Sequence, residues 1–333
     1  MIKKTVLFFG SFLHYSTKVL EALVKSAMVD VVGVVTTPPM PAGRDKKLTK
    51  THTHEWAQAN GLKVFAPQKL DVKSRSYVLQ NIGMKPDFMV TAGYGKLIPA
   101  SWLTLPKISP INLHFSLLPA YRGANPAEWA LLMGEDETGV TMIVMDEEFD
   151  TGRIITRKQI PILFNDNRET LYDKLYDEAG TMAAEILPHV ENTDFATPQQ
   201  EILNEFYAYR MKRSDGFIDW RFIRAAMEGV GLVEPTKYLS TALARAWRFL
   251  SEKENQTYHT PAYFVERSVR ALYGYPGVWT TIETRNQKPE TRNKKRMKIL
   301  EVEVENGKLK LEKVQIEGLK PSRWNEVKNQ VLT

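Results

Sequence analysis

The chain has no cysteine among its 333 residues. This absence excludes disulfides, zinc–thiolate sites, iron–sulfur clusters and thiol nucleophiles, and it suits a reducing cytoplasm. The sequence also lacks an uninterrupted apolar run long enough to span a bilayer. Its first residues, MIKKTVLFFGSFL, have a basic start and an apolar run but no small-x-small cleavage site. They predict a β-strand rather than a signal peptide, and we expect a cytoplasmic protein.

Two further kinds of motif are lacking. The segment GYGK at 93–96 has too few glycines for a dinucleotide fingerprint or a phosphate-binding loop. His52 and His54 have no third ligand nearby in the sequence, so we expect surface residues there rather than a metal site. Nothing in the sequence requires a metal.

The composition is that of a folded protein, with 43% hydrophobic and 25% charged residues, and the length suits two domains. The formal net charge is +6. This surplus shifts the expectation slightly towards a polyanionic partner such as nucleic acid, although many enzymes without such a partner are equally basic.

Short β-rich runs alternate with helical patterns in the first part of the chain. This alternation predicts a doubly wound, Rossmann-like parallel sheet, in which ligands bind beyond the carboxyl ends of the strands. The expected strands lie at 5–9, 29–35, 63–66, 86–95 and 109–115, with helices at 16–26 and 53–61.

The later patterns predict a helix from Pro126 to Gly134, a pair of strands, and a long closing helix over 168–190. We therefore expect a catalytic domain over 1–190, a polar linker over 191–203 and a smaller domain over 204–333. Period-two alternation around an Asn306–Gly307 turn predicts that the second domain is a small, OB-like β-barrel. A largely helical insertion is expected near 221–264.

The stretch INLHFSLLPAYRGANP, residues 111–126, combines apolar and reactive residues. If 109–115 is a strand, Asn112, His114 and Ser116 project from one face. Asn can donate to an oxyanion and His can act as acid or base, while Asp146 and Asp150 are candidate carboxylate partners. A satisfied core histidine remains an equal alternative. A nucleophilic Ser116 is disfavoured because the glycine-flanked nucleophile elbow is missing.

The segment from Asn112 to Gly123, together with TGVTMIVMDEEFDTGRII downstream, resembles the signature of the 10-formyltetrahydrofolate-dependent formyltransferases. The likeness extends to a Pro-Ala-Gly-Arg loop within 34–50. Further matching segments, at 216–220, 269–280 and 317–327, resemble the carboxyl-terminal domain of the methionyl-tRNA formyltransferases. The resemblance therefore covers most of both expected domains.

The resemblance implies roles for individual residues. Asn112, His114 and Asp150 would be the catalytic group, and Arg44 would hold the acceptor end of a tRNA. The residues implied to line the formyl-folate site are Ser116, Leu117, Leu118 and Pro119. Basic residues that could contact tRNA phosphates are Lys294, Lys295, Arg296 and Lys298, although a basic hairpin can also be only a solvated face.

The resemblance further implies transfer of the formyl group of 10-formyltetrahydrofolate, a co-substrate, to the α-amino group of initiator methionyl-tRNA. We expect a monomer without a membrane partner. Two departures from the family pattern are Gly10-Ser11-Phe12 after the first strand and the insertion at 221–264. The alternatives are a sugar-nucleotide N-formyltransferase, a formyltetrahydrofolate hydrolase and a non-enzymatic RNA-binding protein.

Overall fold

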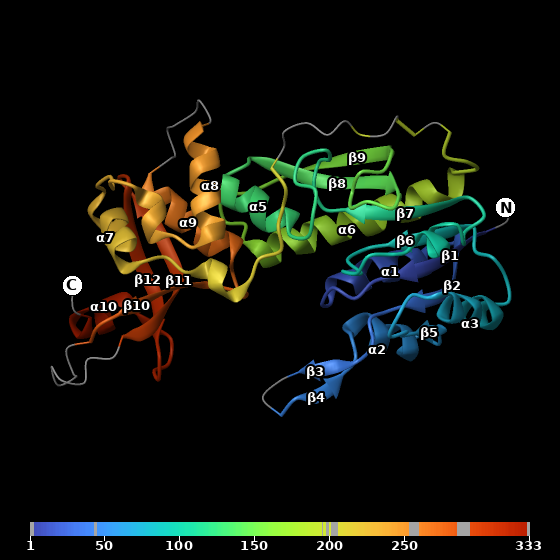
Figure 1. Cartoon of the computed structure of the whole chain (residues 1–333), viewed down its shortest axis with the longest axis horizontal. Helices are drawn as coiled ribbons and strands as arrows, with labels where there is room; N and C mark the ends of the chain where they lie inside the picture. The colour runs from blue at the N-terminus through green and yellow to red at the C-terminus, as the bar shows by residue number, and fades with distance from the viewer. Residues whose placement is uncertain are drawn as a thin grey trace. The chain divides into compact units, whose positions relative to one another are not determined.

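The computed structural model describes residues 3–42, 45–194, 196–197, 200, 206–252, 260–284 and 294–331. The chain divides into two compact units, each with its own sheet (Figure 1). Unit 1 comprises Met1–Pro126, Glu137–Pro161 and Tyr172–Ala208, and unit 2 comprises Ala127–Asp136, Ile162–Leu171 and Tyr209–Thr333. Among the described residues, no helix is long and apolar enough to cross a membrane.

Unit 1 is built on a seven-stranded sheet in the order β5-β2-β1-β6-β7-β8-β9. The first five strands in this order are parallel, and β8 and β9 run antiparallel at one edge. The strands are β1 (Lys4–Phe9), β2 (Val29–Val35), β5 (Val64–Phe65), β6 (Phe88–Thr91), β7 (Ser109–His114), β8 (Glu137–Val144) and β9 (Ile154–Pro161). A small separate hairpin is formed by β3 (Met40–Ala42) and β4 (Lys47–Thr49).

The helices that follow the strands confirm the expected alternation. They are α1 (Tyr15–Lys25), α2 (His52–Ala59), α3 (Val72–Ile82), α4 (Ala100–Leu103), α5 (Pro126–Met133) and α6 (Arg168–Ile186). The parallel strands read as continuous apolar runs because both of their faces are buried. Leu7 and Phe9 of β1, for example, pack in one cluster with Val78 and Ile82 of α3.

The register of the parallel strands aligns their carboxyl ends. Phe9 pairs with both Val35 and Thr91, and Thr91 pairs in turn with Asn112. The end of β7 therefore lies at the carboxyl edge of the sheet, where ligands bind in folds of this class.

The turn after β1, where the sequence departs from the family pattern, is held by side-chain hydrogen bonds. The backbone N–H of Thr37 donates to Ser11 Oγ at 2.8 Å, and that of Phe12 donates to Ser16 Oγ at 2.9 Å. The Phe12 ring stacks on Tyr15 at 5.6 Å between ring centres. Ser11 and Phe12 thus anchor the turn to neighbouring elements.

Unit 2 contains a four-stranded antiparallel sheet in the order β10-β11-β12-β13, which is consistent with the expected small barrel. Its strands are β10 (Val278–Ile282), β11 (Lys295–Glu305), β12 (Lys308–Ile316) and β13 (Ser322–Arg323). Asn306 and Gly307 join β11 to β12 with φ of 52° and 74°. Positive φ at both positions is the mark of a type I′ hairpin turn, as the Asn-Gly pair predicts.

The expected helical insertion contributes to the core of unit 2. Its region holds α7 (Trp220–Glu228), α8 (Thr241–Glu252) and the start of α9 (Pro261–Ala271). A further short helix of unit 2, outside this region, is α10 (Trp324–Val327). The buried rings of Phe222, Trp247 and Phe264 meet edge to face, with ring centres 5.0–6.1 Å apart. Helices α7 and α9 both pack on β12. The segment is therefore part of the fold of this unit.

Replacement of Phe222 by Ala should destabilise unit 2 strongly. The side chain is fully buried, and removing such a ring leaves a cavity that costs about 3–5 kcal/mol. Thermal or denaturant unfolding followed by tryptophan fluorescence would measure the loss. Val233→Ala is a suitable control, because Val233 is 85% exposed in the same region. Equal stability of the two variants would contradict a core role for α7.

Candidate active site

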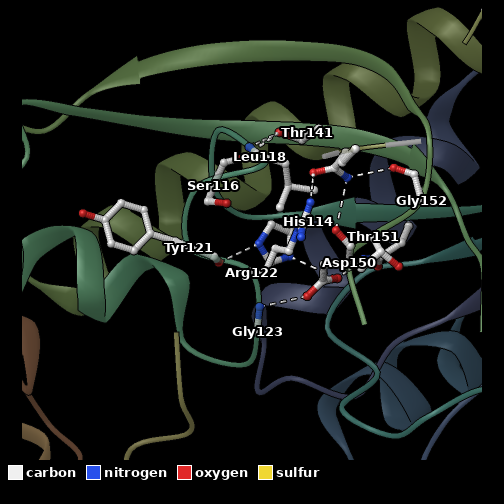
Figure 2. A network of polar contacts seen from close by, with 12 residues as sticks. His114, Ser116, Leu118, Tyr121, Arg122, Gly123, Thr141, Asp150, Thr151 and Gly152 are labelled. Carbon is white, nitrogen blue, oxygen red and sulfur yellow. Dashed lines mark hydrogen bonds and ion pairs between the residues drawn. The ribbon is translucent and has the colours of Figure 1, made fainter. Parts of the chain in front are cut away.

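Asn112 and His114 project from the carboxyl-terminal half of β7. Both belong to the same face of the strand, while Leu113 between them is buried in the core. The structure confirms the strand on which the sequence argument rests. His114 is only 4% exposed, and its ring points towards Asp150 (Figure 2).

Asp150 lies in the connection between β8 and β9. Its backbone has a φ of 57°, in the left-handed region that Asp tolerates better than most residues. Thr151 Oγ1 donates to the Asp146 carboxylate at 2.8 Å, which closes the turn. A Cβ on Gly152 would lie 1.8 Å from the Val144 carbonyl oxygen, so only glycine fits there. The Asp-Thr-Gly sequence therefore serves to aim Asp150 at β7.

Among the described residues, the Asp150 carboxylate contacts three groups. Its Oδ1 lies 3.2 Å from Asn112 Nδ2 and 3.4 Å from His114 Nδ1. Its Oδ2 accepts a hydrogen bond from the backbone N–H of Gly123 at 3.0 Å. The structure thus brings together Asn112, His114 and Asp150, the three residues expected to form the catalytic group.

The imidazole of His114 lies between two acceptors. Nδ1 faces Asp150, and Nε2 lies 3.0 Å from the backbone carbonyl oxygen of Tyr121 (Figure 2). A neutral imidazole carries one N–H, whereas the imidazolium carries two. Only the charged form donates to both acceptors at once.

The charges of the pair support each other. Burial lowers the pKa of His114, but the negative charge and hydrogen bond of Asp150 outweigh it and raise that pKa above its ordinary value. Burial likewise raises the pKa of Asp150, but its pairing with His114 and the Gly123 N–H hold that pKa below its ordinary value. The site therefore favours an imidazolium–carboxylate pair.

The turn after β7 is fixed by buried hydrogen bonds. Ser116 Oγ donates to the Ala120 carbonyl at 2.6 Å, and Thr141 Oγ1 donates to the Ser116 carbonyl at 2.6 Å. Leu118 is fully buried, and its N–H donates to Thr141 Oγ1. Of the four residues expected to line a folate site, only Leu117 and Pro119 are partly exposed. The Ser116 hydroxyl donates its hydrogen bond within the turn and not to His114, whose ring contacts Asp150 and Tyr121.

The expected tRNA-binding residues fall into two groups. Arg44 lies outside the described residues. The four basic residues of the other group lie in unit 2, at or just before the start of β11: Lys294, Lys295, Arg296 and Lys298. The Arg296 guanidinium stacks over the Trp279 ring at 4.3 Å, and Trp279 pairs with Lys298 across the strands. Within the described residues, no group of His, Asp or Glu is arranged to hold a metal ion.

Sequence reasoning missed the residues that support the site through the backbone. The Gly123 N–H and the Tyr121 carbonyl hold the carboxylate and the imidazole. Gln200, in the stretch expected to be only a linker, donates to the carbonyls of Asp150 and Gly152. Gly123 could have been suspected from the Arg-Gly that ends the motif, whereas no pattern in the sequence points to Gln200.

A Rossmann-like sheet with a candidate acid–base group at its carboxyl edge is the architecture of an enzyme. The family model described as formyl transferase matches residues 3–187, so the chain belongs to the formyl transferase family. Membership agrees with the resemblance seen in the sequence motifs.

Similar proteins include two named methionyl-tRNA formyltransferase. One from Staphylococcus epidermidis is 38% identical over 214 residues, which are 64% of this chain and 67% of that protein. One from a Sulfurihydrogenibium species is 34% identical over 241 residues, 72% of this chain and 76% of that protein. The second match covers 241 residues, whereas unit 1 ends at residue 208. The similarity therefore extends into the last segment of unit 2.

Solved structures show the likeness of the fold. A sugar N-formyltransferase from Shewanella is 14% identical with a TM-score of 0.50, covering 87% of this chain and 95% of that one. HypX from Aquifex aeolicus is 16% identical with a TM-score of 0.50, covering 90% of this chain and 39% of that one.

Replacing Asp150 by Asn should lower the pKa of His114 below its ordinary value. The variant removes the negative charge that opposes burial, so that burial and the Arg122 charge together outweigh the hydrogen bond to the Tyr121 carbonyl. Histidine-labelled NMR spectra recorded against pH would follow the titration of the ring. Asp146→Asn is the matched control, because its amide oxygen still accepts the hydrogen bond from Thr151 Oγ1 that closes the turn. An unchanged titration in the Asp150 variant would contradict the pairing.

Proposed function

We propose that the chain transfers the formyl group of 10-formyltetrahydrofolate to the α-amino group of methionyl-initiator-tRNA, giving N-formylmethionyl-tRNA for translation initiation. The observation that carries the proposal is the convergence of Asn112, His114 and Asp150 at the carboxyl edge of the sheet. Family membership and the similarity to proteins named methionyl-tRNA formyltransferase support the substrates.

The reaction is an acyl transfer without a covalent enzyme intermediate. The neutral amine attacks the formyl carbon, the bond from that carbon to N10 of the folate breaks, and N10 gains a proton while the amine loses one. The tetrahedral intermediate carries an oxyanion, which preorganised N–H donors stabilise. Asn112 Nδ2 and His114 Nε2 supply these donors. Nε2 is the ring nitrogen that points away from Asp150, and its N–H turns from the Tyr121 carbonyl to the oxyanion as the intermediate forms.

Asp150 has two tasks in this mechanism. It keeps His114 protonated and oriented, because Asp150 Oδ1 lies 3.4 Å from His114 Nδ1. It also takes part in removing the proton from the amine, since its carboxylate is ionised at neutral pH and can accept a hydrogen bond from the attacking amine. No step requires a metal ion.

The formyl-folate lies on the turn after β7. Leu117 and Pro119 offer partly exposed apolar surface to it, while the buried Ser116 and Leu118 set the shape of the turn. The tRNA is held by Arg44 and by the basic start of β11, and the enzyme acts as a monomer in the cytoplasm. A sugar-nucleotide amine or water as acceptor is the alternative, and a labelled-formyl assay with each acceptor distinguishes them.

Replacement of Asn112 by Ala should lower the turnover number by about a hundred- to a thousandfold, the usual effect of removing one oxyanion donor. Transfer of labelled formyl groups to methionyl-tRNA under single-turnover conditions would measure the chemical step. Asn81→Ala provides a control, because the Asn81 side chain is exposed on α3 and donates to the Tyr77 carbonyl of the same helix. A nearly intact rate in the Asn112 variant would refute the assignment.

Joint replacement of Arg296 and Lys298 by Ala should weaken methionyl-tRNA binding and leave turnover at saturation unchanged. Each lost phosphate contact should reduce the slope of log affinity against log salt by about 0.7–0.9. Equilibrium binding at several salt concentrations would measure the slope. A charge-matched control pair is Lys308 and Lys310 of β12, both exposed. The same change of slope in both pairs would argue against a specific contact at β11.

A further inference from the structure

The stretch that follows α6 returns to the candidate active site. Gln200 Nε2 donates to the Asp150 carbonyl at 3.1 Å and to the Gly152 carbonyl at 2.7 Å. Its Oε1 accepts a hydrogen bond from the Arg122 guanidinium at 3.2 Å. One amide side chain therefore links the Asp150 turn to the loop that follows β7.

Backbone pairing at Ala208 supports the same loop. The Ala208 N–H donates to the Arg122 carbonyl at 2.7 Å, and the Ala208 carbonyl accepts from the Ala124 N–H at 2.8 Å. A Cβ on Gly123 would lie 2.5 Å from the Ala208 carbonyl oxygen, so the chains approach closely there. Gly123 is thus held by Ala208 on one side and by the Asp150 carboxylate on the other.

The two loops need this support because their backbones are strained. Asp150 and Tyr121 both have positive φ, at 57° and 58°, which residues with a side chain adopt at a cost. Such conformations persist where surrounding contacts determine them. The carbonyls of Asp150 and Gly152 also require donors, and Gln200 supplies both hydrogen bonds from one nitrogen.

We propose that Gln200 is a positioning residue for formyl transfer: its amide fixes the Asp150 turn and, through Arg122, the loop that holds His114 and Asp150. This role rests on the proposed function. Gln200 contacts the backbone carbonyls of the turn and the Arg122 guanidinium, so it acts on the reaction through the geometry of Asp150 and of the loop after β7. An error of an ångström in such a group can cost up to about a hundredfold in rate.

The test compares Gln200→Ala and Gln200→Glu with the wild type in formyl transfer to methionyl-tRNA. We expect kcat to fall by about ten- to a hundredfold in both variants at neutral pH, with KM for methionyl-tRNA almost unchanged. Glu keeps the size of Gln and the acceptor for Arg122 but has no N–H. At lower pH its carboxyl group gains a proton and one donor, so the kcat of the Glu variant relative to the Ala variant should rise as the pH falls.

Thr197→Val is the matched control from the same stretch. Thr197 Oγ1 accepts a hydrogen bond from the Ile154 N–H at 3.1 Å, at the start of β9. We expect this variant to lose some stability and to keep the kcat of the wild type. If kcat falls in parallel with stability in Gln200→Ala and in Thr197→Val alike, the role of Gln200 is merely structural. That result would overturn the proposal.

The outcomes also separate this proposal from the proposed function. If the wild type formylates methionyl-tRNA and Gln200→Ala keeps its kcat, the positioning role alone is overturned. If the kcat of Gln200→Glu relative to that of Gln200→Ala does not change with pH, the donor role of the amide is overturned. If the wild type transfers formyl groups to no amine, the proposed function fails together with the role that rests on it.

Discussion

The Asp150 carboxylate is the point at which distant stretches of the chain meet. An unpaired carboxylate is costly to bury, because it loses its hydrogen bonds to water. The buried position of Asp150 therefore depends on every group that replaces those hydrogen bonds. His114 supplies the opposite charge, Asn112 and the Gly123 N–H supply hydrogen bonds, and the aligned strands of the sheet bring these partners within reach. Removing any one partner would leave charge uncompensated, which links the shape of the loops to the ionisation of the pair.

Much of the fold was predictable because it depends on short-range periodicity. Alternating apolar runs and helical patterns located β1, α1, β2 and β7 to within a few residues, and Asn306–Gly307 identified its hairpin. The candidate group was also accessible, because Asn112 and His114 share one face of a strand. Asp150 was recognisable as part of a compact turn downstream, and the family resemblance chose it over Asp146.

The rest was hidden because it depends on contacts that leave no pattern in the sequence. The Tyr121 carbonyl and the Gly123 N–H are backbone atoms, which every residue carries. Gln200 stands in a polar stretch whose composition is typical of a linker. The helical pattern of 221–264 was clear, but only tertiary packing shows that its aromatic rings complete a core. Periodicity predicts which face is buried, and it does not predict what lies against that face.

The pairing of Ala208 with the loop at Gly123 bears on where an autonomous catalytic fragment can end. The family model stops at residue 187, close to the end of α6. A fragment trimmed there would retain all three side chains of the candidate group, yet the Arg122 carbonyl and the Ala124 N–H would lose their backbone partners. The three side chains of the candidate group therefore all lie before residue 151 of the chain. Part of the structure that holds them in place comes from residues some fifty positions later.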